Sequence, residues 1–183
     1  MTDFLTRYRM VMHEVRCGTD QSVFDAMSQL EISFEQLDQR LGEYDDSVIA
    51  ALISNRKFIV ALEAYKQGFR HTYSVCGNEM HLLASQIGYP GATRFGYALL
   101  EAGIDLGVSD RRGMTGLYSM VFAIMIPSNR SDETIDFLLA CIQNASTQAV
   151  HSKNKAGLSA WDIIHARGTK AMIDIVESIH KQG

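Results

Sequence analysis

The sequence predicts an all-α protein in which helix pairs repeat along most of its 183 residues. Apolar residues recur at intervals of three and four, as they do on one face of an amphipathic helix. There are only two prolines, Pro90 and Pro127, and the alternating pattern of strands is scarce. From residue 46 onward, turn glycines recur at long intervals, which is typical of a repeat architecture.

Residues 1–45 are expected to form an acidic N-terminal cap of three helices. The first helix should end at Gly18. Asp20 or Ser22 is the expected N-cap of the second. Ser33, with a glutamine three residues later, fits a capping box that begins the third. Such a cap would cover the apolar face of the first repeat, as repeat arrays require.

Residues 46–183 are expected to hold about four repeats. Glycines Gly77, Gly113 and Gly157 mark successive turns 36 and 44 residues apart. The predicted repeats span about 46–76, 77–112, 113–156 and 157–183. Inserted residues are expected to form loops, at 89–93, 126–131 and 144–147.

The third and fourth repeats carry the most distinctive pattern. Residues 98–103 (ALLEAG) end a helix, and residues 105–118 (DLGVSDRRGMTGLY) form a turn before the next one. Residues 157–164 repeat the second part, with Ser159 in the place of Thr115. These segments resemble the ankyrin repeat, LLxxGADVNxxDxxGxTPLHxA, whose period is about 33 residues. The resemblance implies a solenoid of stacked helix pairs with a hairpin projecting from each pair.

Within these repeats, Thr115 and Ser159 are expected to cap first helices. Asp110 and Asn154 are residue types that bond their own backbone in turns. Gly103 is expected to close a helix in the left-handed conformation, as is Gly68.

The register of the second repeat is ambiguous by one residue. Either His81 or Leu82 can stand at the histidine position of the ankyrin pattern, and the spacing of the turn glycines favours Leu82. Trp161 takes the place of a core leucine and is expected to be a buried anchor.

Composition excludes several classes of function. The net charge of −4 argues against general affinity for nucleic acid. Residues 1–46 hold ten acidic and four basic side chains, whereas residues 47–183 hold eleven acidic and thirteen basic ones. The longest apolar run, residues 121–126, is too short to cross a membrane, and the N-terminus does not resemble a signal peptide.

No catalytic, cofactor or metal motif is found, so a non-enzyme is expected. His13 and Cys17 share a helix face, but two ligands do not make a zinc site. Cys17, Cys76 and Cys141 are odd in number and widely spaced, which favours a reducing compartment. We therefore expect the cytoplasm, or a host cytosol if a specialised system exports the protein.

Partners of ankyrin proteins contact the hairpin tips and the concave face of the first helices. Carried onto this sequence, the resemblance implies a partner-binding surface rich in basic residues, with Tyr73 adding contact area. Its basic residues are Arg70, Arg111, Arg112, Lys153 and Lys155. A single acid, Asp110, lies among them, so we expect an acidic segment of a protein partner.

The expected function is non-enzymatic protein–protein interaction, as in a bacterial effector acting on host proteins. One alternative is an immunity or inhibitor protein that occludes an enzyme of the same cell. Another is a small enzyme or redox sensor that uses Cys76. The N-terminal helices could also screen the basic residues until a partner competes. The oligomeric state stays open.

Overall fold

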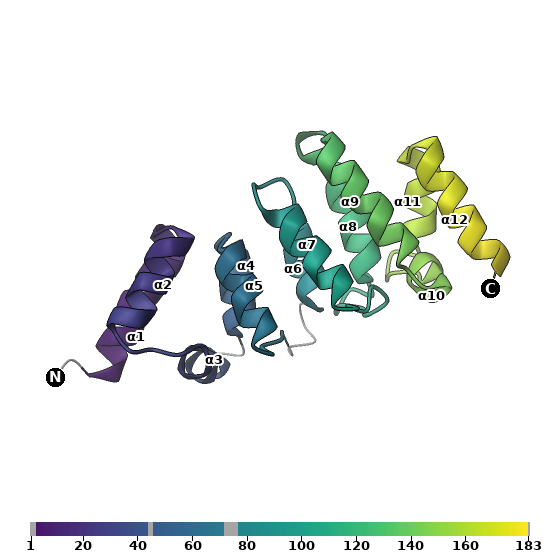
Figure 1. Ribbon diagram of the computed structural model, residues 1–183. Coiled ribbons are helices and arrows are strands. Elements are labelled where there is room, and N and C mark those ends of the chain that lie inside the picture. The colour runs from purple at the N-terminus through teal and green to yellow at the C-terminus, as the bar shows by residue number, and fades with distance from the viewer. Residues whose placement is uncertain (1–2, 44–45, 72–76, 183) are drawn as a thin grey trace. The chain divides into compact units, whose positions relative to one another are not determined.

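The computed structural model describes residues 3–43, 46–71 and 77–182. These residues are mainly helical (Figure 1). Among them, the only β-type pairing is an isolated antiparallel bridge between Ser109 and Thr115. The predicted all-α class is therefore confirmed.

Contacts divide the chain into two compact units, residues 1–73 and 74–183. The sequence placed a boundary earlier, after residue 45. The first predicted repeat thus belongs to the same unit as the acidic N-terminal helices. The boundaries of the individual repeats stay predictions.

The N-terminal unit contains two helix pairs and one further helix in its described part. The helices are α1 (Phe4–Cys17), α2 (Asp20–Gln29), α3 (Phe34–Gly42), α4 (Val48–Ser54) and α5 (Phe58–Lys66). Helix α1 packs on α2, α4 packs on α5, and α2 also contacts α5, while α3 contacts α4. Fully buried side chains such as Val23, Ile49 and Val60 fill this unit.

Of the three starts and stops predicted for residues 1–45, two are confirmed. Helix α1 ends at Gly18, and Ser33 caps α3 through a capping box. The N-cap of α2 is Thr19, so the prediction of Asp20 or Ser22 is wrong. Thr19 Oγ1 accepts from the Ser22 N–H at 3.1 Å, and Ser22 Oγ accepts from the Thr19 N–H at 2.8 Å.

Asp20 instead caps a different helix. Its Oδ1 accepts from the N–H groups of Ile59 and Val60, both at 3.1 Å, at the beginning of α5. The N-cap residue of α5, Lys57, makes no capping bond of its own, and its Nζ donates to the Gly18 carbonyl. The turn between α1 and α2 thus supplies the cap that α5 lacks.

The C-terminal unit is built from three helix pairs and two short helices in its described part. They are α6 (Glu79–Ala84), α7 (Ala92–Glu101), α8 (Gly116–Ile124), η1 (Pro127–Asn129), α9 (Asp132–Gln143), α10 (Thr147–His151), α11 (Ala160–Arg167) and α12 (Lys170–Gln182). The first helices α6, α8 and α11 contact one another in that order, as do the second helices α7, α9 and α12 (Figure 1). No described helix of the chain combines the length and apolar character that crossing a bilayer requires.

The predicted caps and turns of this unit are confirmed. Thr115 and Ser159 accept from N–H groups of α8 and α11 at 3.1 and 3.3 Å. Asp110 and Asn154 each accept two main-chain N–H groups within their own turns. Gly103 has a φ of 74°, in the left-handed region that glycine adopts without strain.

The register predicted for the second repeat is wrong. Asn78 caps α6, and His81 completes the capping box three residues later. His81, not Leu82, therefore stands where Tyr118 stands in the next repeat. The glycine spacing misled because Gly77 directly precedes its cap, whereas Gly113 lies two residues before Thr115.

One predicted loop, 126–131, contains a short helix, and another, 144–147, leads into one. Residues 127–129 form the 3-10 helix η1, and Ser146 caps the five-residue helix α10. Trp161 is half-buried rather than buried. Its indole is larger than the leucine it replaces and lies against the rings of His151 and His165, at centroid distances of 4.8 and 4.1 Å.

Candidate functional site

Four of the predicted basic residues lie on two neighbouring turns of the C-terminal unit. Arg111, Arg112, Lys153 and Lys155 are all exposed. The main-chain N–H of Lys155 donates to the Arg112 carbonyl at 3.0 Å, so the two turns touch. We call these four side chains the basic patch. Like charges that lie this close are a typical docking surface for an acidic partner.

Of the other two predicted residues, one lies in the N-terminal unit and one outside the described residues. Arg70 belongs to the N-terminal unit, where its guanidinium donates to the carbonyls of Tyr65 and Phe69. The same group lies 3.5 Å from the centre of the Tyr65 ring, a cation–π contact. Tyr73 lies outside the described residues.

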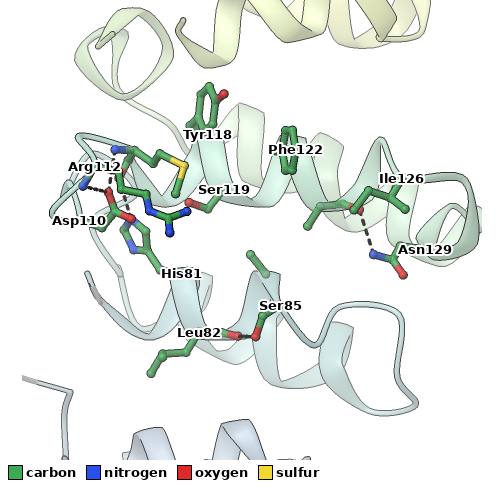
Figure 2. A pocket seen from close by; sticks show the side chains of 13 residues that line it. His81, Leu82, Ser85, Asp110, Arg112, Tyr118, Ser119, Phe122, Ile126 and Asn129 are labelled. Atoms are coloured by element: carbon green, nitrogen blue, oxygen red, sulfur yellow. Dashed lines mark hydrogen bonds between the residues drawn. The ribbon is translucent and has the colours of Figure 1, made fainter. Parts of the chain in front are cut away.

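A groove of about 570 Å³ adjoins the basic patch. It lies between α6, α8 and the turn before α8, and Arg112 forms part of its wall (Figure 2). Its lining residues are His81, Leu82, Ala84, Ser85, Asp110, Arg112, Met114, Tyr118, Ser119, Phe122, Ala123, Ile126 and Asn129. In Figure 2 the groove runs from Asp110 and Arg112 at one end to Ile126 and Asn129 at the other.

The α8 side of the groove is an apolar stripe. Tyr118 and Phe122 are four residues apart and lie on one face of the helix, and Ile126 follows two residues after the helix ends. The rings of Tyr118 and Phe122 stack at 6.3 Å with an interplanar angle of 6°. Phe122 is 53% exposed and Ile126 is 43% exposed, although Val121 and Ile124 of the same segment are fully buried. Large apolar side chains this exposed are a common mark of a binding surface.

His81 fixes the polar end of the groove. Its Nδ1 lies 3.1 Å from the Asn78 nitrogen, and its Nε2 lies 2.8 Å from the Met114 carbonyl oxygen. An imidazole with its proton on Nε2 accepts the first bond and donates the second. His81 thus ties α6 to the turn that carries Arg112, which is a structural role.

Arg112 is the side chain at this end that can bind an anion. The Asp110 carboxylate is held by the N–H groups of Arg112 and Met114, at 2.8 and 2.9 Å. Within the described part of the chain, the Arg112 guanidinium makes no ion pair. Figure 2 shows it extending from the turn into the groove. A guanidinium in this position presents a planar set of donors to a carboxylate.

A smaller groove of about 220 Å³ continues the surface toward α11. Phe122 lines both grooves, and Leu158, which is 45% exposed, lies in the second. Asp162 lines this groove as well. Hydrogen bonds from Ser159 hold the pKa of the Asp162 carboxyl below its usual value of 3.8, with smaller contributions from Lys153 and His151.

Two of the three cysteines lie within the described residues. Cys141 is fully buried, and burial raises the pKa of its thiol, so it is a poor nucleophile. Cys17 is exposed, and Cys76 lies outside the described residues. Within the described ranges, no group of three His, Cys, Asp or Glu side chains is placed to hold a metal ion.

The apolar groove is not among the features predicted from the sequence. The length of the run from Val121 to Ile126 predicts only that it does not cross a membrane, although every fourth residue from Tyr118 marks one helix face.

No family model matches the sequence, and no curated protein matches it either.

Proposed function

We propose that the C-terminal unit is a non-enzymatic module that binds a protein partner through the basic patch and the adjoining groove. The observation that carries this proposal is the exposed pair Phe122 and Ile126, in a groove whose wall includes Arg112. Protein interfaces combine an apolar centre with a polar rim and are enriched in aromatic residues and arginine.

The resemblance to the ankyrin repeat supports the same proposal. Three successive helix pairs contact their neighbours, and a turn of the predicted kind precedes α8 and α11. In ankyrin proteins this arrangement leaves the turns and the first helices to contact partners. We propose that this chain is a divergent member of that group, with Arg70 and Tyr73 as further contacts on the N-terminal unit.

The expected partner carries an acidic segment. Four exposed basic side chains make up the patch, and the nearby Asp110 carboxylate is already occupied by main-chain donors. Arginine and carboxylate groups form paired hydrogen bonds that add both energy and orientation. A host protein would make this chain an effector, whereas an enzyme of the same cell would make it an immunity protein.

Reversal of charge in the patch tests the proposal. The full-length chain is used to capture partners from lysates of the producing cell and of a host cell. The affinity for a captured, purified partner is then measured at low and at high salt. Arg111→Glu combined with Arg112→Glu should weaken binding by about tenfold or more and remove most of its salt dependence.

The matched control reverses two exposed charges on second helices, Arg94→Glu and Lys170→Glu. It changes the net charge by the same amount but does not touch the groove, so affinity should stay near that of the unchanged chain. Equal affinity of all three proteins at both salt concentrations would refute the role of the patch.

A further inference from the structure

We propose that the groove along α8 recognises a short extended segment of the partner in which an acidic residue and a large apolar residue are three or four positions apart. This inference rests on the proposed function and specifies its ligand. The acidic side chain pairs with Arg112, and the apolar side chain lies between Phe122 and Ile126.

The apolar end of the groove fits a single large side chain. Phe122 lies in the last turn of α8, and Ile126 follows two residues after that helix ends. Leu82 and Ala84 of α6 and Ala123 of α8 also line this groove. A leucine, methionine or phenylalanine side chain placed there would cover the exposed faces of Phe122 and Ile126, and removing this surface from water favours binding.

The basic end of the groove selects a carboxylate. Arg112 is exposed, and its guanidinium extends into the groove (Figure 2). Lys155 lies on the adjoining turn and adds positive charge next to Arg112. Lys153 faces the acid Asp162 and contributes less, because the two charges interact. An aspartate or glutamate side chain therefore binds best at Arg112.

The spacing between the two residues follows from helix geometry. Within α8, Phe122 lies about 10 Å along the axis from the N-cap Thr115, and Ile126 lies beyond the end of the helix. An extended chain advances about 3.3 Å per residue. An acidic residue at the basic end and an apolar residue at the apolar end are therefore three or four positions apart in the bound segment.

Selection from a library of random linear peptides tests the inference on the full-length chain. The unchanged chain and the variants Phe122→Ala, Arg112→Gln and Ile59→Ala are each presented with the same library. Ile59 is the matched control, because it is 58% exposed and lies on α5 of the N-terminal unit. Phe122 and Arg112 are both exposed, so the variants should keep the fold.

The unchanged chain and Ile59→Ala should enrich peptides with an acid and a large apolar residue at the predicted spacing. Fluorescence anisotropy with one such peptide should show about tenfold weaker binding to Phe122→Ala and to Arg112→Gln. Replacing the peptide's acid by its amide should weaken binding to the unchanged chain but change little for Arg112→Gln.

Two results would overturn the inference and leave the proposed function standing. The first is enrichment of peptides that need only an acid and bind Phe122→Ala as tightly as the unchanged chain. The second is a concentration-dependent dimer that Phe122→Ala abolishes, since a second copy would then occupy the groove. An unaltered partner affinity after reversal of Arg111 and Arg112 would instead overturn the proposed function itself.

Discussion

Replacing His81 with alanine should destabilise the C-terminal unit by about 2 kcal/mol. The imidazole makes two bonds that alanine cannot make, with the Asn78 N–H at 3.1 Å and with the Met114 carbonyl at 2.8 Å. Each such bond contributes about 0.5–1.5 kcal/mol net, so two contribute about 1–3 kcal/mol. The second bond joins residues 33 positions apart and holds the turn before α8 against α6.

Unfolding in urea, followed by tryptophan fluorescence, measures this loss. Trp161 is the only tryptophan of the chain and lies in the same unit as His81, so its signal reports on that unit. Free energies are obtained by linear extrapolation to water. Glu101→Ala, an exposed change on α7, is the control and should stay within about 0.5 kcal/mol of the unchanged chain.

A loss no larger than that of the control would refute the reasoning. It would mean that water replaces both bonds at no cost, and that His81 does not hold the turn in place. A loss in the predicted range, together with weaker partner binding, would instead show that the position of Arg112 depends on this link.

Three further changes probe other contacts. Gly96→Ala should destabilise the C-terminal unit by about 1 kcal/mol in the same urea assay, because the new Cβ would lie 2.3 Å from Phe137 Cζ. The steric strain exceeds the free energy gained from the higher helix propensity of alanine. A variant as stable as the unchanged chain, or more stable, would contradict this. Asp162→Asn should lower stability at neutral pH by about 0.5–1 kcal/mol. Because the pKa of Asp162 is lowered in the folded chain, its carboxylate contributes fully to the free energy of unfolding above the usual pKa of 3.8, and this contribution is lost as pH falls through the lowered pKa. Well below pH 3.8, Asp162→Asn and the unchanged chain should therefore unfold with the same free energy. Asp20→Ala should remove about 1 kcal/mol from the N-terminal unit, seen as faster hydrogen exchange at the first amides of α5, and unchanged exchange would show that Asp20 is not its cap.

Sequence patterns predicted well the features that depend on a few neighbouring residues. Thr115, Ser159 and Ser33 bond main-chain donors within three positions, and Gly103 satisfies a backbone conformation that other residues avoid. Such features are encoded by residue type at a fixed spacing. They do not depend on what the rest of the chain does.

Features that depend on distant residues were not predicted. Asp20 was expected to cap its own helix, but it bonds amides 39 and 40 positions away. His81 also bonds the Met114 carbonyl, 33 positions away, which no local pattern shows. The exposure of Phe122 depends on where α6 and α11 end relative to α8, and the same is true of the groove beside it.

The two turns that carry the basic patch are held without the help of its side chains. Their bonds come from main-chain atoms and from Asp110 and Asn154, including the contact between Arg112 and Lys155. Substitutions at the four basic positions should therefore leave the scaffold intact. Evolution, or a protein engineer, can retarget this surface to a new partner by exchanging those side chains while the fold stays as stable as before.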